Sequence, residues 1–299
     1  MTGSQRKLIA FIALAYAFSW FLAALFHMLG GRWCTPAAII VGVPYMFGPL
    51  LSAIIVTRFI AHEPVRESLG ISFKLNRWFA VAWLLPVGIS FVAFVAALAL
   101  PDVTYSPDMV GLLERFRGTL SPEQLEKVRA QQAALPMHPL ALGIILALIA
   151  GPTLNAVAAF GEEAGWRGFL QRELGFLGFW KASAFIGVVW GFWHAPVILM
   201  GHNYPHHPYL GVLMMVVFTV LLAPIFAYVR IRANSVIAAA VAHGSINASA
   251  GLAIVLIRGG TELTTGVTGL AGFVVLVVVN AGIWSYHRVT GRPISTGRE

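Results

Sequence analysis

Four ionisable side chains lie inside or beside apolar stretches of this chain, where charged groups are costly. Glu162 and Glu163 are adjacent, and His194 and His243 follow in later stretches. A charged side chain at the centre of a membrane-spanning helix costs about 2.5 to 3.5 kcal/mol on insertion scales, so these residues are functional candidates. A carboxylate and an imidazole are general acid–base groups, and together they could activate a water molecule for hydrolysis.

The first motif is Glu-Glu-x-x-x-Arg, formed by Glu162, Glu163 and Arg167. A helix turns by about 100° per residue, so Glu163 and Arg167 are neighbours at i,i+4 while Glu162 points about 100° away from Glu163. We therefore expect Glu163 to pair with Arg167 and Glu162 to face a cavity as the general base. In the alternative, both acids only cap and pair at the cytoplasmic end of the preceding helix.

The second motif places Trp190 four residues before His194, inside an apolar segment. A lone histidine on such a helix is more often a packing residue than a catalyst. Pro196 follows two residues later, weakens the helix and frees backbone carbonyls. Membranes tolerate broken backbone only where it is buried in protein or lines a water-filled cavity, which favours a functional role for His194.

The third motif places His243 and Asn247 on one face of a later apolar segment. Both side chains can donate a hydrogen bond, and paired donors are what an oxyanion hole requires. Small residues such as Gly244 and Ser245 would let another helix or an extended peptide approach closely. The alternative is a tight helix interface with interhelical hydrogen bonds.

The elements that must position these motifs are membrane-spanning helices. Of the 299 residues, 58% are hydrophobic and only 11% are charged. The net charge of +8 comes from basic residues scattered in short loops rather than along one face, so we expect no nucleic-acid partner. Eight segments reach the roughly 20 mainly apolar residues that a transmembrane helix needs. They are Leu8 to Leu29, Pro36 to Ile60, Trp78 to Leu100, Pro139 to Phe160, Lys181 to Met200, Pro208 to Tyr228, Ser235 to Ile257 and Val267 to Tyr286.

The distribution of basic residues between alternate loops predicts the orientation. Fourteen of the 20 lysines and arginines fall on the side that holds both termini. The short loops of the other side hold only Arg32 and Arg258. Cytoplasmic loops carry the excess of basic residues, so we expect cytoplasmic termini in a multi-pass protein of the cell (inner) membrane. Cys34 is the only cysteine, which excludes an internal disulfide and any multi-thiolate metal site.

One long extracytoplasmic loop, from residue 101 to 138, carries helix signals of its own. Ser106 and Ser121 each precede a proline at a first helical position, and Gln124 completes a capping box with Ser121. Two short helices should follow, as a surface-packed connector or as a lid over a site. No other linker or repeat is present, so we expect a single membrane domain over residues 1–299, with its catalytic motifs within about 147–250.

A second polar loop follows the fifth apolar segment. It contains His202, Asn203, His206 and His207. Its neighbouring prolines predict a tight extracytoplasmic turn. The alternative is an ion-binding site at the surface. In both cases we expect these four residues to lie outside the active site.

Together, the order of the three motifs resembles that of the CPBP intramembrane proteases, also called the Abi or type II CAAX prenyl endopeptidase family. The resemblance extends over about residues 147–249. It implies that Glu162 and His194 bind and activate a water molecule. It also implies that His243 and Asn247 stabilise the tetrahedral oxyanion of a peptide bond under attack.

The same resemblance gives Glu163 and Arg167 a supporting role. The family has also been labelled metalloprotease, and Glu162, His194 and His243 could supply three zinc ligands with one open position. The chain has no His-Glu-x-x-His helix. We therefore favour a mechanism without a cofactor and keep zinc as an alternative.

These features predict an intramembrane endopeptidase that works in the lipid bilayer on a peptide or membrane-protein substrate. No segment indicates a prenyl pocket. A non-catalytic membrane scaffold, or a bacteriocin-immunity protein of the same fold, is the main alternative. A proton-coupled transporter would also use intramembrane Glu and His, but the first three apolar segments contain no acidic residue.

Overall fold

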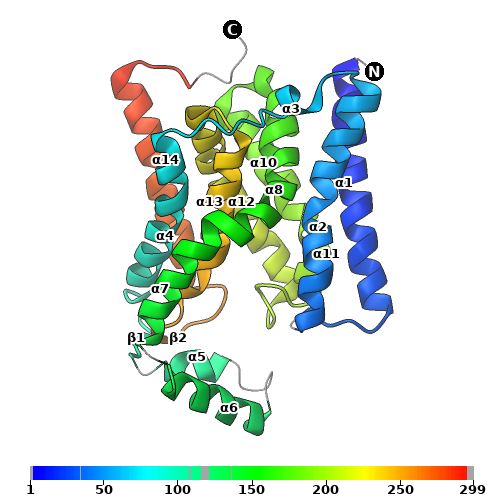
Figure 1. Cartoon of the computed structure of the whole chain (residues 1–299). Helices are drawn as coiled ribbons and strands as arrows, with labels where there is room; N and C mark the ends of the chain where they lie inside the picture. Colours follow the sequence, from blue (N-terminus) through cyan, green and yellow to red (C-terminus); the bar gives the residue numbers. More distant parts are fainter. Residues whose placement is uncertain (1–2, 34, 108, 116–120, 136, 295–299) are drawn as a thin grey trace.

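The chain folds into a bundle of helices, which confirms the predicted all-α, polytopic class (Figure 1). The computed structural model describes residues 3–33, 35–107, 109–115, 121–135 and 137–294. Within these residues, seven helices are long and apolar enough to cross a membrane. They are α1 (Gly3–Met28), α2 (Pro36–Ile55) with a π-helical extension (Val56–Ile60), α4 (Arg77–Ala97), the run from α7 to α9, α12 (Pro208–Ala233), α13 (Val236–Ser249) with a 3-10 turn (Ala250–Ala253), and α14 (Leu270–Thr290).

The remaining predicted segment, the fifth, is a broken helix. It consists of α10 (Phe179–Trp193) and α11 (Ala195–Leu199), which meet at His194. Pro196 has no N–H group to donate, so the regular helical ladder cannot continue through this point. All eight predicted apolar segments are thus helical, and the fifth contains the interruption that its proline predicts.

The fourth segment is longer than its sequence predicted. It runs through α7 (Pro139–Ala150), a π-helical stretch (Gly151–Asn155), α8 (Ala156–Glu163), a second π-helical stretch (Ala164–Leu170) and α9 (Gln171–Glu173). The apolar segment was predicted to end at Phe160, and the alternative in which Glu162 and Glu163 cap the end of the helix was wrong, because the helix continues to Glu173. The helix can continue because Arg167, the next charged residue, is buried in an ion pair with Glu163.

Close packing of the inner helices depends on glycine. A Cβ atom on Gly244 of α13 would lie 2.4 Å from the carbonyl oxygen of Gly151. A Cβ atom on Gly191 of α10 would lie 2.5 Å from the Cα of Val216 on α12. Only glycine allows backbones to approach this closely, which confirms the close approach predicted for the small residues around His243.

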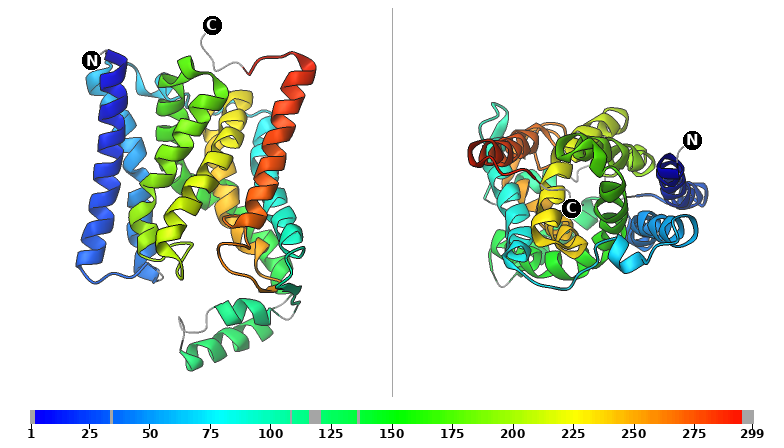
Figure 2. Two further views of the ribbon diagram at one scale, coloured as in Figure 1. Left: turned by 180° about the vertical axis from the view of Figure 1, so that it is seen from behind. Right: turned by 90° about the horizontal axis from the view of Figure 1, so that it is seen from above.

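The described residues of the loop from 101 to 138 form a small unit at the end of the bundle opposite the termini. Strand β1 (Val103–Tyr105) pairs antiparallel with β2 (Ile257–Gly259), which follows α13. The helices α5 (Val110–Arg115) and α6 (Pro122–Ala133) lie beneath the bundle (Figure 2). They confirm the two predicted short helices, although the first begins at Val110 rather than directly after Ser106, because Met109 has a positive φ of 58°.

The predicted capping box is present at the start of α6. The Ser121 N–H donates to Gln124 Oε1 at 2.8 Å, and the Gln124 N–H donates to Ser121 Oγ at 3.2 Å. A bidentate pair between Arg258 and Glu114 connects α5 to β2, at 2.7 and 2.9 Å. The short helices are therefore attached to the chain that leaves α13.

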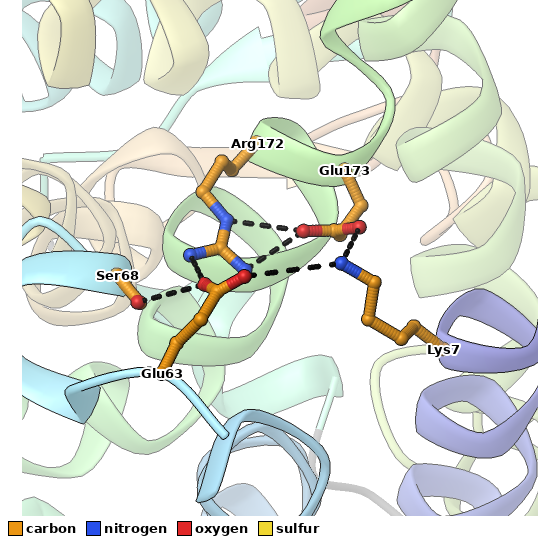
Figure 3. Close-up of polar contacts among 5 residues, drawn as sticks. All are labelled: Lys7, Glu63, Ser68, Arg172 and Glu173. Atoms are coloured by element: carbon orange, nitrogen blue, oxygen red, sulfur yellow. Dashed lines mark hydrogen bonds and ion pairs between the residues drawn. The ribbon is translucent and has the colours of Figure 1, made fainter. Parts of the chain in front are cut away.

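At the end that holds both termini, an ion cluster joins three parts of the chain (Figure 3). Lys7 of α1 lies 3.0 Å from Glu173 of α9, and Arg172 lies 2.6 Å from Glu63 and 2.7 Å from Glu173. Burial alone would raise the pKa of Glu63, but its bonds to Ser68 and Arg172 outweigh this effect and lower that pKa. Ser68 ends the short helix α3 (Val65–Ser68), and a 3-10 turn (Gly175–Leu177) connects α9 to α10.

Candidate active site

The four residues predicted to act in catalysis line one cavity of about 720 Å³ inside the bundle. Glu162 comes from α8, His194 from the break between α10 and α11, and His243 and Asn247 from α13. The other lining side chains are mainly apolar and aromatic. Three separate parts of the chain therefore place these side chains around a shared space.

Glu162 is buried, with 2% of its surface exposed, yet it borders this cavity as its helical position predicts. Its Oε2 atom accepts a hydrogen bond from Nε1 of Trp190 at 2.6 Å. Its Oε1 atom has no hydrogen-bond partner among the described residues. Because an ionised carboxylate only accepts hydrogen bonds, Oε1 is available to a donor within the cavity.

His194 is oriented by the same tryptophan. Its Nδ1 atom lies 2.8 Å from the carbonyl oxygen of Trp190, one turn earlier. A carbonyl oxygen accepts hydrogen bonds, so Nδ1 carries the proton and Nε2 of the neutral ring is an acceptor. Trp190 therefore holds both Glu162 and His194, through its indole and its backbone respectively.

At the break after α10, a backbone carbonyl accepts hydrogen bonds from aromatic side chains of the first two long helices, α1 and α2. The carbonyl oxygen of Trp193 accepts hydrogen bonds from Trp20 Nε1 at 3.0 Å and from the Tyr45 hydroxyl. These bonds hold the Trp193 carbonyl, which lies next to His194, whereas the carbonyl that Pro196 leaves without its helical donor is that of Phe192, four residues before the proline. Tyr45 also lines the cavity, so α2 contributes a wall that the motifs did not predict.

Glu163 links the first motif to the third. Its Oε1 atom accepts from Arg167 Nη1 at 2.9 Å and from His243 Nδ1 at 2.9 Å. The first contact confirms the predicted i,i+4 pair, whereas the second was not predicted. The Arg167 guanidinium also lies 4.3 Å from the centre of the Trp190 ring, in a cation–π contact.

Asn247 lies one turn after His243 and borders the same cavity, which confirms that the two residues share a face. Its side chain is exposed and has no hydrogen-bond partner among the described residues. His243 is only 4% exposed, and its Nδ1 is held by Glu163. Asn247 and Nε2 of His243 are thus the groups of α13 that remain available to a bound molecule.

The polar loop after α11 lies closer to this cavity than expected. His202 and Asn203 both line it, which corrects the expectation that the cluster is separate from the site. The His202 N–H donates to Val197 O at 3.0 Å, and Gly201 and Asn203 have φ angles of 96° and 58°. These left-handed positions turn the chain back over the cavity, and the imidazole packs 5.7 Å from the Trp33 ring.

Glu262, in the connection between β2 and α14, is a second carboxylate of the cavity that sequence patterns missed. It accepts from the His206 N–H at 2.9 Å and from His207 Nδ1 at 3.0 Å. This bonding connects the loop after α11 to the segment before α14 and engages Nδ1 of His207. No periodicity or motif marks Glu262, because its position depends on two loops meeting in space.

The zinc alternative needs three ligands that converge on one point. Within the residues that the structure describes, no group of three His, Cys, Asp or Glu side chains has that arrangement. The geometry of Glu162, His194 and His243 does not fit a three-ligand site, and we route no chemical step through a metal.

Fold and site together define a polytopic membrane protein with a carboxylate–imidazole cavity inside its bundle. Residues 138–249 match the family model described as Rce1-like: Type II CAAX prenyl endopeptidase Rce1-like. The matched region contains all three motifs and confirms the family that they predicted, which is a family of peptidases. A comparison of the chain with curated proteins gives no match.

Proposed function

We propose that this protein is an intramembrane endopeptidase that hydrolyses a peptide bond with an activated water molecule. The observation that carries the proposal is the arrangement of Glu162 and His194. Both border one cavity, both are held by Trp190, and each retains a hydrogen-bond acceptor that has no partner among the described residues. A water molecule has two hydrogens to donate, and we propose that one water donates them to Glu162 Oε1 and His194 Nε2.

In this proposal, Glu162 is the general base. It takes a proton from the water as the hydroxide oxygen forms a bond to the carbonyl carbon of the substrate. The resulting tetrahedral intermediate carries its negative charge on the former carbonyl oxygen. When the carbon–nitrogen bond breaks, protonated Glu162 returns its proton to the leaving amine, and the base is regenerated.

His243 and Asn247 would stabilise the oxyanion. Asn247 can donate from its side-chain amide, which has no partner among the described residues. Since Nδ1 of His243 donates to Glu163, a donation to the oxyanion must come from Nε2, which requires the imidazolium form. The Glu163 carboxylate accepts from both Arg167 and His243 Nδ1, and so Glu163 and Arg167 position His243 instead of contacting the substrate.

The proposed substrate is a hydrophobic peptide or a segment of a membrane protein. The cavity walls contain Tyr45, Met46, Phe218 and Ile246, which suit apolar side chains. The bilayer surrounds the bundle, because its long apolar helices need a lipid environment. We propose the cell membrane as its location and a single domain over residues 1–299.

The decisive experiment compares Glu162→Gln with Glu163→Gln. Both purified variants are reconstituted in liposomes with a library of fluorogenic hydrophobic peptides, and their melting temperatures are measured in detergent. Glu162→Gln should abolish cleavage and keep the wild-type melting temperature, because the amide oxygen of Gln still accepts from Trp190. Glu163→Gln should lower the melting temperature, because it leaves Arg167 buried without its counter-ion, a change that costs about 3 to 5 kcal/mol in comparable pairs.

Retained cleavage by Glu162→Gln would refute the assigned base. Absence of cleavage by the wild-type protein across the library would favour a non-catalytic scaffold or a bacteriocin-immunity protein. Proton flux coupled to the movement of a solute would favour a proton-coupled transporter. Treatment of the active protein with a chelator, together with elemental analysis, tests the metal alternative. Full activity after chelation, with no zinc in the protein, is the expected result.

A further inference from the structure

A second hollow lies at the end of the bundle that holds the termini, apart from the cavity that Glu162 borders. It is a groove of about 480 Å³ between the start of α10 and the end of α14. Its walls combine aromatic, apolar and basic side chains, among them Phe179, Trp180, Trp284, Arg288, Arg292 and Ile294. None of these six residues lines the first cavity, so the proposed peptidase chemistry does not use them.

The chain that follows α14 forms one wall of this groove. Gly291 ends the helix with a φ of 64°, a left-handed conformation that glycine adopts without strain. The chain then turns back across the end of the bundle (Figure 2). His287 Nδ1 donates to the Arg292 carbonyl oxygen at 2.6 Å, and Ile294 packs against a small hydrophobic cluster that includes Phe179. These contacts fix the wall that carries Arg292.

The two arginines of the groove have no acidic partner among the described residues. Arg288 and Arg292 are both exposed, and neither takes part in an ion pair there. Between residues 174 and 294, the sequence contains one acidic residue, Glu262, which precedes the other end of α14. Lys181 in α10 and Arg232 in α12 add positive charge to the neighbouring helix ends. The groove therefore presents positive charge that no described carboxylate neutralises.

The tryptophans place the groove at the level of lipid headgroups. Trp180 lies in the first turn of α10, and Trp284 lies within two turns of the end of α14, a helix long and apolar enough to span a membrane. Tryptophan is enriched at the boundary between membrane and water, where its ring contacts lipid and its N–H reaches polar groups. The Arg288 guanidinium lies 5.7 Å from the centre of the Trp284 ring, in a cation–π contact. Positive charge and exposed aromatic surface therefore meet at one membrane interface.

From these observations we infer that the groove binds the phosphate group of an anionic phospholipid. Arg288 and Arg292 bind the phosphate oxygens, because guanidinium groups form charge-assisted and often bidentate hydrogen bonds with phosphate. The exposed rings of Trp180 and Trp284 contact the acyl chains. Basic pockets between membrane helices are suited to phospholipid headgroups. A free phosphate ion would use the same arginines but would gain nothing from the aromatic wall. This binding site does not depend on the proposed peptidase function.

Lipid titration of the full-length protein tests this site. Delipidated protein in detergent is titrated with phosphatidylglycerol or phosphatidylcholine, and the bound lipid is measured by native mass spectrometry. The wild-type protein should bind phosphatidylglycerol about tenfold more tightly, and the double variant Arg288→Gln/Arg292→Gln should lose this preference. The matched control is Arg58→Gln/Arg66→Gln, which removes the same charge from exposed residues at the same end of the bundle (Figure 1). Its affinity for phosphatidylglycerol should stay within about twofold of the wild-type value, because these arginines lie outside the groove.

Equal losses of affinity in the two double variants would overturn the inference, because they would indicate a general attraction between charges and not a site. Wild-type affinity in Arg288→Gln/Arg292→Gln would overturn it as well. Inorganic phosphate separates the two sources of a phosphate group: millimolar phosphate should leave the bound lipid in place, and displacement of the lipid would assign the groove to a free anion instead. Both double variants should keep the wild-type melting temperature in lipid-free detergent, which separates a loss of binding from a loss of folding.

Discussion

Trp190 offers the sharpest test of the site, because its indole and its backbone orient the two proposed water ligands. Trp190→Phe keeps an aromatic ring beside Arg167 but removes the Nε1 donor that lies 2.6 Å from Glu162 Oε2. A hydrogen bond to a charged group contributes about 1.5 to 3 kcal/mol. Since about 1.4 kcal/mol corresponds to a factor of ten, kcat should fall roughly 10- to 100-fold.

Trp193 provides a matched control for Trp190 on the same helix. It is also buried, but its Nε1 atom has no hydrogen-bond partner among the described residues. Trp193→Phe therefore creates a similar gap in packing without removing a hydrogen bond. Its kcat should stay within about threefold of the wild-type value. Both variants lose the same part of the indole ring, but only Trp190→Phe also loses a hydrogen bond.

The assay measures kcat and KM with one fluorogenic peptide in liposomes, together with the melting temperature of each variant. Trp190→Phe should lower kcat and leave KM nearly unchanged, since the lost bond orients the base and not the substrate. Equal losses in the two variants would mean that packing alone explains the effect. Wild-type kcat in Trp190→Phe would refute the role given to the indole.

Three further variants test the fold around the site. Gly244→Leu should lower the melting temperature strongly or prevent folding, because its Cβ would lie 2.4 Å from the Gly151 carbonyl oxygen. Gly244→Ala should have a smaller effect. A wild-type melting curve for the leucine variant would contradict the packing of these two helices. Ser121→Ala should destabilise α6 by about 1 kcal/mol, because it removes the acceptor for the Gln124 N–H; faster amide exchange in α6 would show this. Glu63→Gln should lower the melting temperature at pH 7 but make little difference near pH 3. The pKa of Glu63 is lowered in the folded protein, so its ion pairs stabilise the fold above the unfolded-state pKa, and this stabilisation is lost as the pH falls. An equal effect at both pH values would argue against the ion cluster.

Much of the fold could be predicted from local sequence signals. Apolar length alone located the eight helical segments, because the bilayer leaves few alternatives for a chain of this composition. Pro196 marked the break beside His194, and Ser121 with Gln124 marked the start of α6. These features depend on residues within one or two turns of each other, which is the range that sequence patterns describe well.

The contacts between segments could not be predicted in the same way. Glu163 was assigned to Arg167, four residues away, but its carboxylate also binds His243, which is 80 residues away in sequence. The donors to the Trp193 carbonyl come from α1 and α2, and nothing in Trp20 or Tyr45 indicates this role. The length of the fourth helix was underestimated because a charged pair looks like a helix end until its burial is known.

The charge balance of the site connects its structure to the proposed chemistry. Glu163 and Arg167 are both buried and compensate each other, so they add no net charge to the interior. Glu162 and His243 remain, and an uncompensated charge at this depth would be costly. The site is neutral when Glu162 is ionised and His243 is protonated, and equally when Glu162 is protonated and His243 is neutral. These two neutral states differ only in where one proton resides, and acid–base catalysis needs such a proton to move without creating a buried net charge. In the first state, the base can accept a proton from water and the imidazolium can donate to an oxyanion, so one of the two neutral states is the state that the proposed reaction requires.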